Sequence, residues 1–336
     1  MTRKDSNRRR AAMLAACCLA LLLGMVASVL FGATRYGWSV AWDAAFRYDE
    51  NAVQQMIVRT TRMPRAFMAA SIGASLAIAG ALMQTLTRNP LASPGVLGIN
   101  SGASFVVVTA TLLFSVASMQ ALAWLAFAGA AAAAGAVYLL SSLGREAMTP
   151  MKIVLAGSAL TALFSSFTQA ILVLNQQGLN SVLYWLTGTI AGRSTDMLRT
   201  VLPYMAACWI GAWLISRDLN VLLMGEDASK GLGQRTAWLK TIAGLIVVVL
   251  AGGAVSVAGP IGFIGVVVPH LARHLSGHDH RWLIPFSGVL GALLLVAADL
   301  AARFILIPEE VPVGVMTALV GVPFFFYLAR RRAGSA

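Results

Sequence analysis

The chain has 336 residues, of which 58% are hydrophobic and only 11% charged, and its mean hydropathy is +0.77. Because a soluble domain carries roughly 25% charged residues, this composition excludes a water-soluble globular protein. The formal net charge of +12 comes from cations at both termini and in short loops, which favours membrane topology and lipid headgroups over nucleic acid as the reason for it. A basic face interleaved with aromatic residues, typical of nucleic-acid binding, is absent.

Ten apolar segments have the length of membrane spans, about 20 residues each. They lack the alternating polar residues of a membrane β-barrel, so we predict an all-α polytopic protein with one transmembrane domain over residues 1–336. The first segment is longer than a signal-peptide core of about 7–15 residues, and we expect a retained helix. The eighth contains Pro269, and we expect it to be short, broken or tilted. The expected spans are 11–33, 62–86, 94–114, 118–141, 150–174, 195–216, 239–258, 261–277, 281–305 and 313–330.

The distribution of positive charge predicts the orientation of these spans. Ten crossings place both termini on one side, and that side then carries 17 lysines and arginines against eight on the other. The positive-inside rule makes the richer side cytoplasmic. Three of the eight outside cations lie together at residues 59–65. An arginine near a span end either reaches to the headgroups or makes a specific contact, and the sequence leaves both open for Arg62 and Arg65.

Signatures of catalysis or of a resident cofactor are missing from the sequence. No glycine-rich loop ends in Gly-Lys-Ser/Thr, so the chain does not bind a nucleotide phosphate by that route. The cysteines fall within apolar segments without metal-ligand spacing. The histidines gather in one stretch interrupted by Pro269 and Gly277, which favours a helix-capping loop near headgroups over a metal site. These residues are Cys17, Cys18 and Cys208, and His270, His274, His278 and His280.

One carboxylate, Asp299, lies clearly within a predicted span, and it precedes Arg303 by four residues, so the two are expected to neutralise each other. Most ion-coupled carriers need more than one such group near the midplane. We therefore favour a passive path driven by another protein. An ion-coupled secondary carrier acting alone and a non-transporting membrane scaffold are the alternatives.

Residues 217–238, RDLNVLLMGEDASKGLGQRTAW, form a cytoplasmic segment of mixed charge in this topology. The residues between Gly225 and Gly233 have helical spacing, which predicts a helix there. The solvated side of the segment would carry Glu226, Asp227 and Lys230. The apolar side of the segment would carry Leu219, Leu222, Leu223 and Leu232.

Several longer motifs resemble a known family. They are RMPR, AGALMQ, RNPLASPGVLGINSGAS, YWLTGTIAG, LLMGEDASKGLG, AGPIGFIGVVVPHLAR, DHRWLIP and PEEVPVGVMTALVGVPFFFYL, in the family's order from about residue 59 to 328. The chain resembles the FecCD-type permease subunits of type II ABC importers for iron–siderophores, haem and cobalamin.

The resemblance implies an architecture and a set of partners. The fold would be the type II importer permease fold of about ten helices. Two permease subunits, identical or paired, would enclose one path through a bacterial plasma membrane, with two cytoplasmic ABC ATPases, an external binding protein and surrounding lipid. No cofactor is implied. The cargo would be an intact metal chelate, with ferric siderophore favoured as the commonest one, and haem and cobalamin left open.

The resemblance also assigns roles to residues of this chain. Arginines of the R-x-P-R motif and one before the last span would dock acidic residues of the binding protein: Arg62, Arg65 and Arg303. The 217–238 segment would couple to the ATPase through Gly225, Glu226, Ala228, Leu232 and Gly233. A cytoplasmic gate would consist of the Asn-Pro-Leu turn and a hydroxyl pair in the fifth span: Asn89, Leu91, Ser165 and Ser166.

Overall fold

The computed structural model describes residues 3–32, 34–143, 149–175, 179–307 and 309–333, so Arg145, one of the expected cytoplasmic cations, lies outside them. Within these ranges the chain consists of helices and their connections. The helices are α1 (Arg3–Leu30), α2 (Trp38–Phe46), α3 (Val53–Ile57), the π-helical turn η1 (Val58–Arg62), α4 (Met63–Leu86), the 3₁₀ turn η2 (Pro94–Leu97), α5 (Ile99–Leu113), α6 (Met119–Ser142), α7 (Pro150–Leu174), α8 (Leu179–Leu186), α9 (Thr195–Leu214), α10 (Ser216–Leu222), α11 (Glu226–Gly231), α12 (Thr236–Ala258), α13 (Ile264–Ser276), α14 (His280–Ile305) and α15 (Val313–Ala333).

Each of the ten expected spans corresponds to a helix, which confirms the all-α prediction. Six helices in the described ranges are long and apolar enough to cross a membrane alone, and a seventh span results if α9 and α10, bent by 51°, are taken together. Two further apolar helices, Ile99–Leu113 and Val313–Phe324, are shorter. The predicted eighth span is α13, a helix of only 13 residues that contains Pro269.

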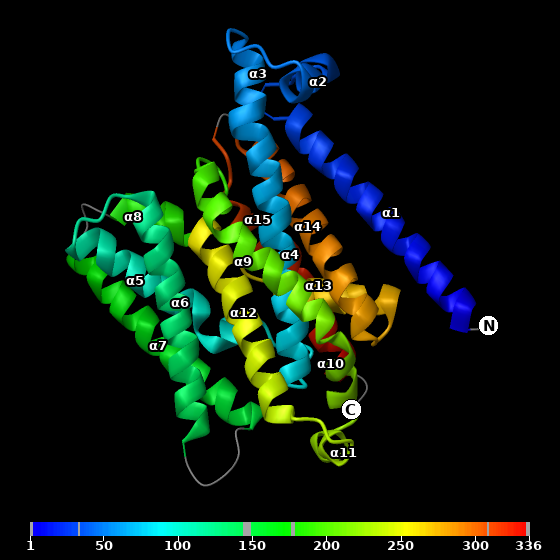
Figure 1. Ribbon diagram of the computed structural model, residues 1–336. Helices are drawn as coiled ribbons and strands as arrows, with labels where there is room; N and C mark the ends of the chain where they lie inside the picture. Colours follow the sequence, from blue (N-terminus) through cyan, green and yellow to red (C-terminus); the bar gives the residue numbers. More distant parts are fainter. Residues whose placement is uncertain (1–2, 33, 144–148, 176–178, 308, 334–336) are drawn as a thin grey trace.

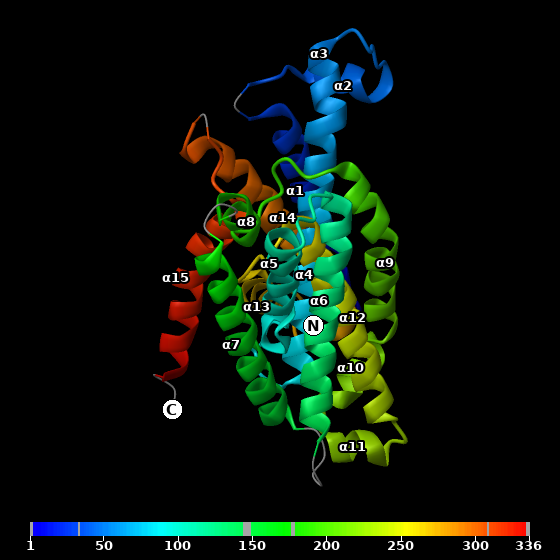
Figure 2. The same cartoon turned by 90° about the vertical axis from the view of Figure 1, so that its left-hand side faces the viewer.

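Helix α4 lies at the centre of the bundle, between α14, α12, α13 and α9 (Figures 1 and 2). Its small residues allow this position, because they let neighbouring backbones approach closely. A Cβ atom added to Gly73 would lie 2.2 Å from the carbonyl oxygen of Gly291 in α14. One added to Gly80 would lie 2.1 Å from the carbonyl oxygen of Gly265 in α13. Glycine is therefore required at both crossings.

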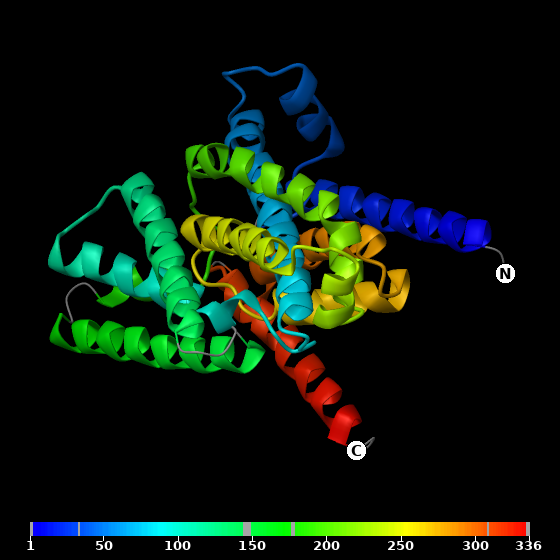
Figure 3. The ribbon, with the colours of Figure 1, turned by 60° about the horizontal axis from the view of Figure 1, so that its bottom comes forward.

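Other helices lie at the sides of this centre. Figure 3 shows α5, α6 and α7 grouped on one side and α1 running along another, with α15 projecting away. In the 18-residue apolar stretch of each helix, only 6% of α1 and 11% of α7 are buried. Both helices therefore present wide apolar surfaces to lipid or to another subunit. Helices α2 and α3 lie together at one end of the bundle and α11 at the other (Figure 1).

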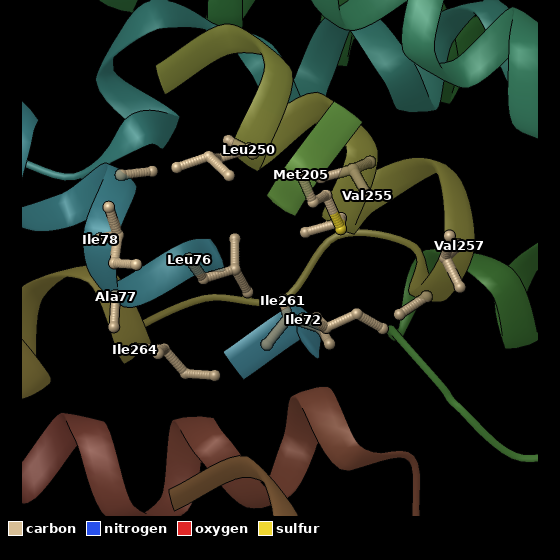
Figure 4. Close-up of a cluster of buried hydrophobic side chains, with 14 of the residues drawn as sticks. Ile72, Leu76, Ala77, Ile78, Met205, Leu250, Val255, Val257, Ile261 and Ile264 are labelled. Carbon is tan, nitrogen blue, oxygen red and sulfur yellow. The ribbon is translucent and has the colours of Figure 1, made fainter. Parts of the chain in front are cut away.

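The main hydrophobic cluster surrounds α4, and a smaller one consists of Ala272, Leu283 and Phe286 in α13 and α14. Figure 4 shows side chains from α4, α9 and α12 converging with those of the segment that enters α13. Ile72, Met205 and Leu250 are fully buried at this meeting point. Burying apolar side chains of this size makes the centre a closely packed body, against which the two polar ends of the bundle are held.

Candidate functional site

The three arginines predicted to dock a binding protein lie together at the end of the bundle that carries α2 and α3. Arg62 ends the π-helical turn η1, and Arg65 follows in the first turn of α4. Arg303 lies in the last turn of α14. Helix packing brings these distant positions together, because α4 and α14 pack along their length through the Gly73–Gly291 crossing.

Two of these arginines bind the C-terminal end of α1. Arg62 donates through Nη1 to the carbonyl oxygens of Val29 at 2.9 Å and Leu30 at 3.2 Å. Arg303 donates through Nη1 to the carbonyl oxygens of Ser28 at 2.7 Å and Phe31 at 3.2 Å. The last carbonyls of a helix lack partners within the helix and lie at the negative end of its dipole. Both guanidinium groups therefore serve as caps for α1.

Asp299 connects Arg65 with Arg303. Arg65 donates to it through Nε at 3.0 Å and through Nη2 at 2.8 Å, and Arg303 donates to its second oxygen. The i, i+4 pairing of Asp299 with Arg303 predicted from sequence is thus confirmed. Arg65 also forms an ion pair with Glu310 at 2.7 Å. Two cations and two carboxylates balance one another, which is the condition for burying charge.

The accessible part of this network is small. Arg62 is 8% exposed and Arg303 4%, and Asp299 is 1% exposed. Arg65 retains 12% side-chain exposure and Glu310 30%. The surface therefore presents the Arg65–Glu310 pair, and Arg62 and Arg303 lie beneath it, bonded to α1.

The predicted coupling segment lies at the opposite end of the molecule (Figure 1). Gly225 adopts a φ of +119°, which a side chain disfavours, and it begins α11. Glu226 pairs with Lys240 at 2.7 Å and with Lys230 at 3.3 Å. The hydrogen bond from Lys240, ahead of that from Lys230, lowers the pKa of Glu226. Gly233, at a φ of +80°, follows the helix.

The coupling segment has a buried side and an exposed apolar side. Leu219 and Leu222 pack into the bundle at 0% and 3% exposure. Leu223 and Leu232 are 45% and 67% exposed. Ala228 is also exposed. The four leucines expected on one apolar side are thus divided between the core and the surface.

The predicted gate residues lie in two places, one pair in the turn after α4 and the other pair within α7. Asn89 Oδ1 accepts a hydrogen bond from the backbone N–H of Leu91 at 3.0 Å, which closes a tight turn after α4. Ser165 and Ser166 lie within α7, eight residues beyond Gly157, where α7 packs against η2. At 1.5 Å per residue that is about 12 Å along the helix. The hydroxyl pair therefore lies further along α7 than its contact with η2, with Ser165 half-buried and Ser166 exposed.

The predicted histidine loop is mostly helical. His270 and His274 lie in α13, where their Nε2 atoms are 3.2 Å apart. His280 begins α14 and is buried. The cap itself is formed by Asp279, which accepts from the backbone N–H of Arg281. Among the described residues no group of three or more His, Cys, Asp or Glu side chains is placed to hold a metal ion.

A second buried polar cluster, at the cytoplasmic end predicted from charge, was missed from sequence. Gln84 and Thr85 are 3% and 4% exposed. Thr85 contacts His280, and Gln84 binds Arg273. Adjacent polar residues at the end of an otherwise apolar span were the available signal, since a buried polar group needs a partner.

Comparison with known proteins agrees with this architecture. The family model of the FecCD transport family matches residues 20–331. The siderophore transport system permease protein YfiZ of Bacillus subtilis is 52% identical, over 93% of this chain and 94% of that protein. The Fe(3+)-citrate import system permease protein YfmD of the same organism is 44% identical, over 97% and 98%. A solved metal-chelate type ABC transporter in an inward-facing conformation superimposes with a TM-score of 0.84 at 29% identity, covering 96% of this chain and 99% of that one. The chain belongs to the FecCD transport family of ABC-importer permeases.

Proposed function

We propose that this chain is the permease subunit of a bacterial ATP-driven importer that moves an intact ferric siderophore into the cytoplasm. The similarity to YfiZ, a siderophore transport permease, and to YfmD, an Fe(3+)-citrate import permease, supports this class of cargo. The observation that carries the ATP-driven mechanism is the coupling segment. Leu223, Met224 and Leu232, at 45%, 69% and 67% exposure, form an apolar face at one end of the bundle, as contact with an ATPase requires.

The partners follow from this role. Two copies of a cytoplasmic ABC ATPase bind the coupling segments at residues 217–238, and a second permease subunit completes the path. The wide apolar surface of α7, only 11% buried, supports a partner subunit or lipid there. Both termini lie in the cytoplasm of a plasma-membrane protein, as the excess of positive charge on that side favours.

The external binding protein docks at the arginine cluster of Arg62, Arg65 and Arg303. An acidic side chain of that protein replaces Glu310 on Arg65, since this ion pair is the accessible part of the network. Arg62 and Arg303 hold the ends of α1 and α14 that frame it. Salt weakens such docking, because exposed charge pairs are screened.

Movement of the coupling segment opens the path at the inner gate. The turn that contains Asn89 and Leu91 directly follows α4, so a shift of that helix end moves the turn. Ser165 and Ser166 line a second constriction further along α7. Gly225, Glu226, Ala228, Leu232 and Gly233 are the residues of the ATPase contact.

Uptake by the reconstituted complex tests the cargo. Proteoliposomes that contain the chain, its ATPase and its binding protein should accumulate a ferric siderophore when ATP is enclosed. Accumulation of haem or cobalamin in place of the ferric siderophore would refute the cargo assignment.

Docking is tested by charge reversal at the accessible arginine. Arg65→Glu should weaken binding-protein association most strongly at low salt. Arg199→Glu is the matched control, because Arg199 is 77% exposed and pairs only with Asp196 among the ion pairs described. Equal binding by both variants and the unaltered chain would exclude the arginine cluster as the docking site.

A further inference from the structure

A series of hydrogen bonds joins the coupling segment to the inner end of α4. Its members come from three helices: Asn220 from α10, His280 from the start of α14, and Thr85 from the last turn of α4. His280 is 2% exposed and Thr85 4%. The contact between these two side chains therefore lies away from solvent, where a missing hydrogen bond is costly, and the contacts of Asn220 are part-buried.

The neighbours of Asn220 determine which way its amide points. Its Nδ2 donates to a carboxylate oxygen of Asp279 at 2.7 Å. Its Oδ1 accepts from the backbone N–H of His280 at 2.9 Å. A carboxylate can only accept and a backbone N–H can only donate, so the amide has one orientation that satisfies both.

This orientation fixes the proton on His280. The same Asn220 oxygen lies 2.9 Å from His280 Nδ1, which must therefore carry the hydrogen. In a neutral imidazole the other nitrogen then accepts. His280 Nε2 lies 2.6 Å from the Thr85 hydroxyl, which donates to it. In this tautomer the Thr85 hydroxyl is the donor whenever that bond forms.

The bond to His280 competes with a bond inside α4. Thr85 Oγ1 also lies 2.9 Å from the carbonyl oxygen of Ala81, one turn earlier. A hydroxyl has a single hydrogen, so Thr85 donates either to His280 or back to its own helix. The Thr85 hydroxyl thus has two acceptors within reach, Nε2 of His280 and the carbonyl oxygen of Ala81.

Asn220, at the other end of this series of hydrogen bonds, belongs to the coupling segment, and α10 and α11 of that segment are bonded to each other. Ser229 of α11 is fully buried, and its single hydroxyl hydrogen lies between two acceptors, the carbonyl oxygens of Val221 in α10 at 2.9 Å and of Gly225 at 2.6 Å. Gln234 donates to the carbonyl oxygen of Asp218 at 2.8 Å. These bonds make α10 and α11 one unit, so a displacement of α11 also displaces Asn220.

We infer that Asn220, His280 and Thr85 are positioning residues that transmit movement of the coupling segment to the turn after α4. The inference rests on the proposed function, in which an ATPase moves that segment. Displacement of α10 shifts Asn220 and the N-terminal end of α14, and His280 carries the shift to Thr85. The turn of Asn89 and Leu91 begins only a few residues later.

Removal of one hydroxyl tests this relay. Thr85→Val keeps the shape of the side chain and removes the donor, and Thr85→Ser keeps the donor. Thr87→Val is the matched control: Thr87 is buried in the same helix end, at 5% exposure, but its hydroxyl donates to Met83 within α4. The measurement is the number of ferric chelates taken up per ATP hydrolysed by the reconstituted complex.

Thr85→Val should lower this ratio about fivefold while ATP hydrolysis continues, the size of effect that loss of one hydrogen bond has on an equilibrium. Asn220→Ala should do the same, and the double variant should be no worse than either single variant, because both interrupt one path. Thr85→Ser and Thr87→Val should keep the ratio.

An unchanged ratio for Thr85→Val, or an equal loss for Thr87→Val, would overturn the relay and leave the proposed function intact. Failure of the unaltered complex to couple uptake to ATP would instead remove the proposed function. Co-purification of each variant with the ATPase confirms that a lowered ratio does not come from lost assembly.

Discussion

Replacement of Asp299 by asparagine should be strongly destabilising. Both carboxylate oxygens bind arginine: Oδ1 accepts from Nε and Nη2 of Arg65, and Oδ2 accepts from Nη2 of Arg303 and from Nε of Arg65. An asparagine has one oxygen and one NH₂ group, so in either orientation one guanidinium faces a donor. It also has no charge, and Glu310 then remains as the only carboxylate paired with these cations among the described contacts.

The magnitude follows from burial. Asp299 is 1% exposed and Arg303 4%, and breaking a buried ion pair by removing one partner costs about 3–5 kcal/mol. The matched control is Asp196→Asn, whose pair with Arg199 is 77% exposed on both sides. An exposed pair contributes about 0–1 kcal/mol. The two substitutions are chemically identical and differ only in their surroundings.

The assay is unfolding of the purified chain by SDS in mixed micelles, followed through fluorescence of its 8 tryptophans. Asp299→Asn should lower the free energy of unfolding by at least about 2 kcal/mol more than Asp196→Asn does. Equal effects of the two variants would refute the conclusion that the arginine network holds the adjoining ends of α1, α4 and α14 together.

Two further predictions concern packing and pH. Gly73→Ala should destabilise the chain by about 1–3 kcal/mol, because its Cβ would lie 2.2 Å from the carbonyl oxygen of Gly291. Gly244→Ala is the control and should not destabilise the chain, because nothing lies within 4 Å of its Cβ. Thermal unfolding of the two variants measures the difference. Because Lys240 lowers the pKa of Glu226, their ion pair should stabilise α11 at every pH above the ordinary pKa of a glutamate, about 4.3. This stabilisation should be lost as the pH falls through the lowered pKa. The protection factors of the α11 amides, in which the intrinsic pH dependence of exchange is divided out, should therefore be larger at neutral pH than in acid, and Glu226→Gln should remove this difference.

The helices of this protein were predictable because the membrane imposes a simple condition on them. A span needs about 20 apolar residues, and the segments that meet it are visible in the sequence. The pairing of Asp299 with Arg303 was also predictable, since i, i+4 residues share one face of a helix. Both features depend on neighbours along the chain.

The surroundings of Arg62 were not predictable in this way. Its acceptors are the backbone carbonyls of Val29, Leu30 and Thr34 and the hydroxyl of Thr34, and backbone acceptors leave no residue-type signature. Its burial depends on where α1 ends relative to α4. The partnership of Thr85 with His280 has the same character, because it follows from the packing of α4 against α14 and not from local sequence.

We propose that movement through this chain is driven by ATP hydrolysed on a bound partner. The most direct measurement is uptake of a ⁵⁵Fe-labelled siderophore into proteoliposomes that contain the chain, its ATPase and its binding protein, with and without enclosed ATP. We expect uptake that requires ATP, persists when a proton ionophore collapses the ion gradient, and is lost with Glu226→Arg in the coupling segment. Uptake that proceeds without ATP and stops with the ionophore would contradict this proposal and identify an ion-coupled carrier.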